Sequence, residues 1–228
     1  MNAVQPLASS DWLLLQLADS AFPTGGFAHS AGLEAAYQHK EVRTRDHLVE
    51  FIEAALRQCA QSSLLFVRSA HDQPSSFESL DHRFDAFTTN HVANRASRTQ
   101  GRAFLATSER AFQLEPVRGL KQMVQSRGLP GHFAVVFGHV LRLLNFDRLT
   151  SLRLFFFNHL RGIISSAVRL NIVGPMDGQT LQSRTNPMAE NLLESALVVP
   201  LERATQTAPL LDLFQSTQDR LYSRLFQS

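Results

Sequence analysis

The chain has 228 residues, of which 44% are hydrophobic, so it can bury a sizeable core and a disordered chain is excluded. Its one cysteine, Cys59, excludes an intramolecular disulfide and a zinc site built from several cysteines, and it fits a reducing compartment. Residues 1–90 carry 6 basic and 11 acidic side chains whereas residues 91–228 carry 16 and 9, so a protein partner and a nucleic acid are both candidates.

The most distinctive segment comes early in the chain. Residues 17–34 place Pro23, Gly25 and Gly26 between two segments of helical character. Proline fixes φ and lacks a backbone donor, while glycine permits a positive φ or the close approach of another backbone. The pattern predicts a shaped surface loop between two helices.

Helical periodicity continues through the middle of the chain. Apolar residues recur at helical spacing from Asp46 to about Asp72, which predicts one amphipathic helix. The sequence at 73–76 then breaks the pattern, and the next helix carries an apolar face from Phe77 to His91. Further helices are predicted over about 93–112, 117–127 and 130–145.

The longest helical pattern runs from Asp147 to Asn171 and predicts a central helix. Gly174 and Pro175 end it, and Pro175 can start the following helix. Strand signals are poor, since alternation is rare and no Asn-Gly turn occurs. We therefore predict an all-α fold, a single-domain helical bundle over 1–228 with a central helix surrounded by others.

No segment predicts a membrane span or a signal peptide. The apolar runs near Leu143 and Phe155 are interrupted by arginines, and the first residues lack a basic segment. We expect a cytoplasmic protein without membrane contact.

Catalytic and metal-binding patterns are weak. The sequence lacks Gly-x-x-x-x-Gly-Lys-Ser/Thr, so a P-loop nucleotide site is not predicted. Asp19, Ser20 and His29 are the residue types of a hydrolytic relay, which leaves a hydrolase as one alternative, although no nucleophile-elbow motif accompanies them. The nine histidines are dispersed, so neither a bound metal nor a cofactor is predicted.

Two sets of arginines suggest contacts. Arg95, Arg98 and Arg102 fall on one face of a helix, which suits an acidic protein surface and leaves an arginine-rich nucleic-acid-binding bundle as another alternative. Arg161 and Arg169 lie in an apolar helix. Each must meet a carboxylate or carbonyl oxygens, or emerge at an interface, because an unpaired buried guanidinium is costly.

The C-terminal segment 218–228 places apolar side chains at the end of the sequence. Leu221, Tyr222, Leu225 and Phe226 need a pocket, either on the parent domain or on a partner.

Several of these segments together resemble the urease accessory protein family UreF. The resemblance is carried by residues 17–34, by 161–170 with 174–179, by 222–228, and more weakly by residues 95–102. It implies a non-enzymatic, all-α homodimer that bridges a UreD/UreH-type scaffold protein and a UreG-type GTPase, and so couples GTP hydrolysis to nickel delivery into apo-urease. It implies no nucleic-acid partner.

The resemblance also implies which residues meet partners, with the tail at about 218–228 joining the scaffold. These residues are Asp19, Phe22, Pro23, Gly25, Gly26, His29, Ser30, Glu34, Arg98, Arg161, Arg169, Tyr222, Arg224, Leu225 and Phe226. The sequence departs from the family where a His-Glu pair precedes the tail tyrosine, because Gln218 and Asp219 stand there instead.

Overall fold

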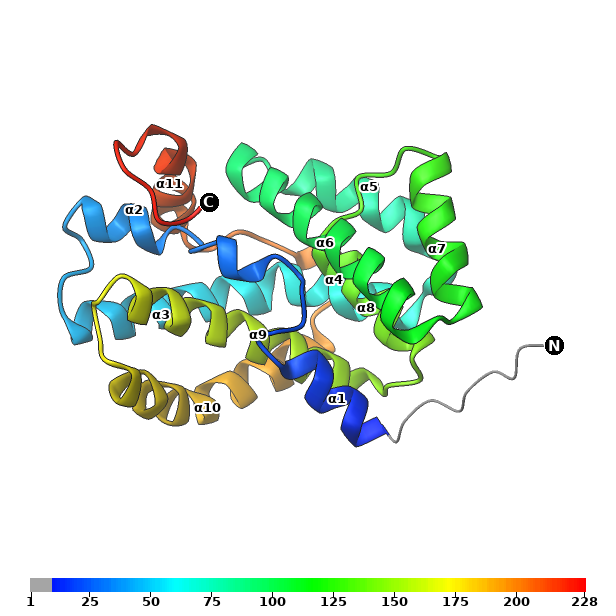
Figure 1. Cartoon of the computed structure of the whole chain (residues 1–228), viewed down its shortest axis with the longest axis horizontal. Coiled ribbons are helices and arrows are strands. Elements are labelled where there is room, and N and C mark those ends of the chain that lie inside the picture. Colours follow the sequence, from blue (N-terminus) through cyan, green and yellow to red (C-terminus); the bar gives the residue numbers. More distant parts are fainter. Residues whose placement is uncertain (1–9) are drawn as a thin grey trace.

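The computed structural model describes residues 10–228, which form eleven α-helices, four short 3-10 helices and no strand (Figure 1). The α-helices are α1 (Ser10–Ala18), α2 (Leu33–Gln38), α3 (Arg45–Gln61), α4 (Ser63–Asp72), α5 (Phe77–Phe87), α6 (His91–Phe112), α7 (Glu115–Ser126), α8 (Phe133–Leu143), α9 (Arg148–Arg169), α10 (Pro175–Val198) and α11 (Pro209–Thr217). The 3-10 helices are η1 (Gly26–Ala28), η2 (Pro74–Ser76), η3 (Leu201–Arg203) and η4 (Gln218–Arg220). The predicted all-α bundle is confirmed.

Side-chain caps fix where several helices begin. Thr44 Oγ1 accepts a hydrogen bond from His47 N at the start of α3, and Asp147 Oδ1 accepts one from Thr150 N at the start of α9. Asn90 Oδ1 accepts from two backbone N–H groups in the first turn of α6. Each bond satisfies donors that an uncapped helix would leave unpaired.

Two predicted helices were wrong in their extent. The helix predicted over 46–72 is broken at Ser62, whose φ of −128° and ψ of −98° separate α3 from α4. The apolar pattern continues across the break, because both helices face the same core. The helix predicted over 77–91 ends at Phe87, since Asn90 is used as the cap of α6.

The most deeply buried helix is α8. The sequence had instead predicted that the helix corresponding to α9 lies at the centre. Eight consecutive residues of α8, Ala134–Leu141, are buried, whereas α9 exposes Arg153 and Phe157 to solvent. A Cβ at Gly138 would collide with the carbonyl oxygen of Val67, so glycine permits α8 to pack closely on α4. Between Ala134 and Leu141 the only polar side chain of α8 is His139, so this stretch can be covered on all sides, whereas the arginines of α9 require an outer face.

The arginine-rich stretch of α6 is used for packing against the segment that leads into α8. A Cβ at Gly101 would collide with the carbonyl oxygen of Gly131, and Arg102 donates hydrogen bonds to Leu129 O and Pro130 O. Ser97 Oγ accepts from Phe133 N at 3.2 Å. Part of the middle motif is therefore explained by contacts inside the bundle.

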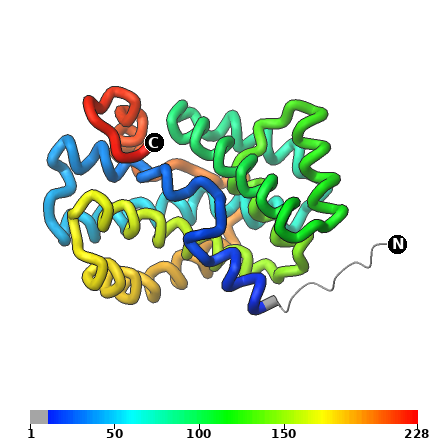
Figure 2. Tube along the Cα trace, viewed as in Figure 1, coloured from blue at the N-terminus to red at the C-terminus, as the bar shows by residue number. Residues whose placement is uncertain are grey.

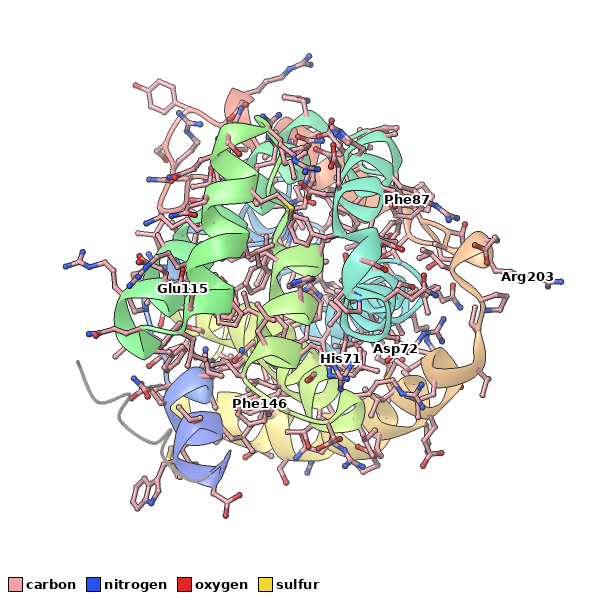
Figure 3. All side chains as sticks on the ribbon, turned by 90° about the vertical axis from the view of Figure 1, so that its right-hand side faces the viewer. His71, Asp72, Phe87, Glu115, Phe146 and Arg203 are labelled. Atoms are coloured by element: carbon pink, nitrogen blue, oxygen red, sulfur yellow. The ribbon has the colours of Figure 1, made fainter. Side chains whose placement is uncertain are left out.

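At the end of the bundle that faces the viewer in Figure 3, α4 is tied to the connection between α8 and α9. His71 is buried, and its Nε2 lies 3.0 Å from the carbonyl oxygen of Phe146 (Figure 3). Such a bond satisfies the buried imidazole and holds the connection against the core.

No helix within residues 10–228 combines the length and the apolar content needed to cross a lipid bilayer.

The buried histidines predict a loss of stability in mild acid. Burial lowers the pKa of His139 and of His159 from 6.5 to about 4. Below about pH 6.5 the unfolded chain takes up protons that the folded chain does not, so the free energy of unfolding should fall between pH 6.5 and 4, by about 2 kcal/mol per histidine at pH 5.

Urea titrations at pH 7 and pH 5 check this expectation. His139→Phe keeps a ring beside Phe77, which His139 contacts edge-on at 5.2 Å, but cannot titrate, so its stability should vary less with pH than that of the wild type. Parallel pH profiles for the two proteins would contradict the assignment.

Candidate functional site

Three segments that are distant in sequence meet on one face of the bundle. These are the loop of residues 19–31, the tail of residues 218–228, and the C-terminal half of α9 (Figure 2). Gln227 N donates to Ala28 O at 2.7 Å, and Ser30 N donates to Ser228 O. The loop and the tail therefore lie side by side, and we call their surface with the end of α9 the loop–tail face.

The loop is fixed at one end and exposed at the other. Phe22 is buried and stacks on Phe112 with ring centroids 6.0 Å apart. Gly25 has a left-handed φ of 76°, which turns the chain into η1 and leaves the Phe27 side chain 70% exposed. Gly26 lies outside the left-handed region, so of the two adjacent glycines Gly25 is the one that the backbone conformation requires.

Arg169 joins the loop to the tail. Its guanidinium carbon lies 3.6 Å from the ring centroid of Phe27 and 4.1 Å from that of Phe226, and it donates a hydrogen bond to Phe27 O. Cation–π contacts of this kind contribute about 0.5–2 kcal/mol each. The end of α9 thus holds both segments with one side chain.

The tail is anchored by a buried carboxylate. Glu34, on α2, is 2% exposed and accepts hydrogen bonds from Gln218 Nε2 at 2.5 Å, Leu225 N at 2.6 Å and Phe226 N at 3.1 Å. A buried carboxylate needs such donors, because burying it without them is costly. Gln218 and Phe226 are themselves buried, so the tail docks on its own domain.

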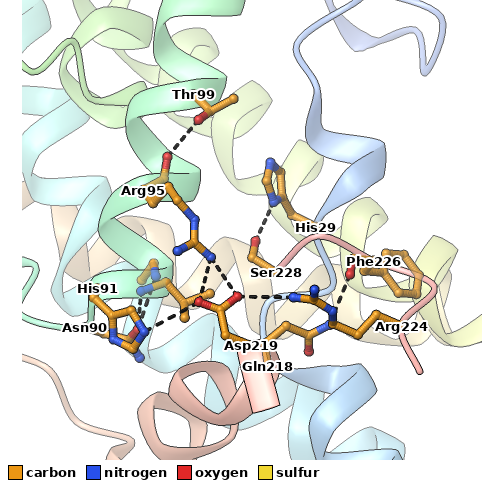
Figure 4. Close-up of polar contacts among 12 residues, drawn as sticks. His29, Asn90, His91, Arg95, Thr99, Gln218, Asp219, Arg224, Phe226 and Ser228 are labelled. Atoms are coloured by element: carbon orange, nitrogen blue, oxygen red, sulfur yellow. Dashed lines mark hydrogen bonds and ion pairs between the residues drawn. The ribbon is translucent and has the colours of Figure 1, made fainter. Parts of the chain in front are cut away.

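A second carboxylate holds the outer side of the tail (Figure 4). Asp219 pairs with Arg95 of α6 at 2.8 Å, with Arg224 at 3.3 Å and with His91 at 3.6 Å. In the same view His29 Nδ1 is bonded to Ser228 Oγ (Figure 4). The Asp219 contacts are solvent-exposed, so each contributes about 0–1 kcal/mol and they fix direction more than stability.

Arg161 and Arg169 differ from the other arginines of α9. Arg148 pairs with Asp72, and Arg153 pairs with Glu190. Within residues 10–228, neither Arg161 nor Arg169 has a carboxylate oxygen within 4 Å, and both instead donate to carbonyl oxygens, Ala18 O for Arg161 and Phe27 O for Arg169. The sequence allowed three alternatives for these arginines, namely a carboxylate, carbonyl oxygens or an interface. In the structure the two side chains bind carbonyl oxygens.

A groove of about 530 Å³ runs between the loop, α9 and the start of α10. Arg161 and Arg169 line it, and so do Gly25, His29 and the open side of α9 at Gly162. Burial lowers the pKa of His29 from 6.5 to about 4, with a smaller contribution from Arg95. The imidazole is therefore neutral near pH 7. The groove is mainly apolar, and its charged lining residues are Arg161, Arg169 and Asp19, which leave it weakly cationic.

Known proteins with this sequence pattern identify the family. A family model described as UreF matches residues 42–186. A protein named urease accessory protein F from Arabidopsis thaliana is 40% identical over 235 residues, which cover 100% of this chain and 97% of that protein. The chain belongs to the UreF family of urease accessory proteins. The rice protein of the same name (Oryza sativa subsp. japonica) is 37% identical over 99% of this chain and 88% of its own, and an Actinobacillus pleuropneumoniae protein named urease accessory protein UreF is 27% identical over 94% and 97%.

In this UreF-family chain the predicted partner residues fall into two groups. Phe22, Ser30, Glu34 and Phe226 are buried and hold the loop–tail face together. The others reach solvent at least in part: Asp19, Pro23, Gly25, Gly26, His29, Arg98, Arg161, Arg169, Tyr222, Arg224 and Leu225. Sequence reasoning missed the exposed Phe27, although an aromatic residue directly after two glycines is a signal that could have pointed to it. It named Gln218 only as a departure from the family and did not predict its buried contact with Glu34.

The rival constellations do not form the contacts that they require. Asp19, Ser20 and His29 all line the groove, but in the part of the chain that the structure describes neither Asp19 nor His29 makes a hydrogen bond to Ser20. Asp19 Oδ1 accepts from Ala21 N, and His29 Nδ1 is bonded to Ser228 Oγ. Arg95 and Arg102 are engaged with Asp219 and with carbonyl oxygens, so they do not form a stripe of free cations. Among residues 10–228, no three His, Cys, Asp or Glu side chains are grouped so that they could hold a metal ion.

Removing the Glu34 carboxylate should release the tail. In Glu34→Ala, the buried donors of Gln218 and Phe226 lose their acceptor at a cost on the order of 1–3 kcal/mol each, and the part-buried Leu225 N loses its acceptor too. The state with the tail undocked then becomes lower in free energy. Hydrogen exchange of residues 221–227 should accelerate while the rest of the bundle stays protected. Glu41→Ala, at an exposed acidic residue, serves as the control, and unchanged exchange in Glu34→Ala would refute the anchoring role.

Proposed function

We propose that this chain is a non-enzymatic urease maturation factor that bridges a UreD/UreH-type scaffold protein and a UreG-type GTPase. As a homodimer, it would couple GTP hydrolysis by the GTPase to nickel insertion into apo-urease. The observation that carries the proposal is family membership together with the loop–tail face, on which segments from both ends of the described chain are joined by hydrogen bonds at the surface.

The side chains exposed on this face are of the kind that protein interfaces use. Phe27 is 70% exposed, Leu225 is 52% exposed and Tyr222 is fully exposed, although each belongs to a segment fixed by buried neighbours. Aromatic anchors on a rigid support lose little conformational entropy on binding. A docking role accounts for their exposure better than internal packing does.

Absence of a nucleotide motif supports assigning the chemistry to a partner. The sequence lacks the P-loop pattern, and its single lysine in residues 91–228, Lys121, pairs with Glu109. The chain would therefore organise partners and leave GTP hydrolysis to the GTPase.

Pull-down against candidate scaffold, GTPase and urease subunits tests the proposal, with nickel-dependent urease activation as a second readout. The full chain should capture the scaffold and, with it, the GTPase. Tyr222→Ala should weaken scaffold capture while leaving helicity unchanged, and it is a cleaner probe than deleting 222–228, which would also expose Glu34 and Arg169. Failure to capture either partner, with the chain folded, would sink the proposal.

Variants at the two loop glycines distinguish backbone strain in the loop from a steric block of partner binding. Gly25 has a positive φ, so Gly25→Val should lower the melting temperature through strain on the order of 1–3 kcal/mol. Gly26→Val meets only the flexible Thr24 side chain, at 3.3 Å, so its stability should stay near wild type while GTPase recruitment and urease activation fall together. Melting curves, pull-downs and activation assays on both variants check this. Normal activation by Gly26→Val at matched expression would remove the loop from the interface.

A further inference from the structure

The groove beside the loop–tail face holds the two arginines of α9 that lack a carboxylate partner. Arg161 and Arg169 are eight residues apart, so their backbones are separated by about 12 Å along the helix axis. Each guanidinium donates one hydrogen bond to a backbone carbonyl oxygen. Its other N–H groups can donate to a further acceptor. A ligand that meets both guanidinium groups must therefore extend along the helix axis for a length of this order.

Arg169 is arranged to bind an anion through the edge of its guanidinium. The ring centroids of Phe27 and Phe226 lie 3.6 and 4.1 Å from the guanidinium carbon of Arg169, so two rings hold the guanidinium in position. A planar guanidinium fixed in this way presents N–H groups in the fork that matches a carboxylate. Glu34 lies close enough to interact with Arg169, but its oxygens are already engaged by the tail.

Arg161 has a partly compensated charge. Asp19 acts on it electrostatically without approaching within 4 Å, and Asp19 Oδ1 is engaged by Ala21 N. The Phe157 ring lies 5.6 Å from the Arg161 guanidinium carbon. An incoming carboxylate would therefore meet a guanidinium that has no ion pair to break.

Between the two arginines the groove is open. A Cβ at Gly162 would meet nothing within 4 Å. Asn158 and His159 also line this stretch, but Asn158 Oδ1 and His159 Nε2 are shielded from solvent and so from an incoming peptide. The open stretch therefore supplies space for a peptide, and the two guanidinium groups supply its polar contacts.

We propose that this groove binds an extended acidic segment of a partner protein, with one carboxylate at Arg161 and a second at Arg169. An extended chain advances about 3.3 Å per residue, so a span of about 12 Å places the two acidic residues about three or four positions apart. The proposal deepens the proposed function and rests on it only in that the segment belongs to a urease maturation partner.

Short fluorescein-labelled peptides of serine and valine test the groove directly. Three of the peptides carry two glutamates that are adjacent, three positions apart or four positions apart, and the fourth carries two glutamines four positions apart. Binding of each peptide to the full chain is measured by fluorescence anisotropy at low and high salt. The glutamate peptides with the wider spacings should bind at least about tenfold more tightly than the adjacent and glutamine peptides, and salt should weaken them. Equal binding of all four peptides would overturn the proposal.

A pair of glycine variants locates the binding. Gly162→Phe fills the open part of the groove without meeting another atom at its Cβ, whereas Gly119→Phe places the same side chain on α7, where a Cβ is equally free. Binding should fall at least about tenfold in Gly162→Phe and stay unchanged in Gly119→Phe, with equal melting temperatures. Retained binding by Gly162→Phe, or tighter binding of a labelled single-stranded oligonucleotide than of any peptide, would contradict an acidic-peptide groove.

The peptide-binding assays use no urease component, so their outcome is independent of the proposed function. Peptide binding without urease activation by the wild type would reject the maturation role and leave the groove assigned. Activation by Gly162→Phe at the wild-type level would show that maturation does not use the groove.

Discussion

The loop–tail face depends on the buried carboxylate of Glu34. A carboxylate that is 2% exposed is stable only when donors surround it, and three of its donors come from Gln218, Leu225 and Phe226. Docking the tail therefore supplies hydrogen-bond donors to the Glu34 carboxylate of α2, and that carboxylate in turn holds the tail in place. Phe226 is then positioned to cover Arg169, whose other ring contact is Phe27, so the same carboxylate helps to position the exposed end of the loop.

Periodicity predicted most of the fold because helices repeat a local pattern. The extents of α6 and α9 and the start of α10 at Pro175 agree with the sequence within a few residues. The break at Ser62 could not be predicted, since the residues on both sides keep the same apolar face and the change lies in two backbone angles. The full burial of α8 depends on α4 approaching at Gly138, which is a tertiary contact.

The candidate site was predictable in its parts but not in its assembly. The glycine loop, the two arginines of α9 and the aromatic tail all stand out in the sequence. Glu34, however, looks like an ordinary acidic residue in the first turn of a helix, and its partners lie 184–192 positions away. A single sequence carries no signal that joins residues at such separations, so whether the tail docks on its own domain or waits for a partner stayed open until the structure placed it.

The uneven charge of the sequence is partly compensated by ion pairs inside the fold. Acidic residues of the first 90 pair with basic residues of the remainder, as in Glu78 with Arg127 and Asp72 with Arg148. Such pairs use part of the cationic excess of the second half to connect helices. Arg161 and Arg169 are outside this pairing, and both line the groove beside the loop–tail face. Two guanidinium groups held in one groove favour recognition of a specific acidic segment over binding to a uniformly charged polymer.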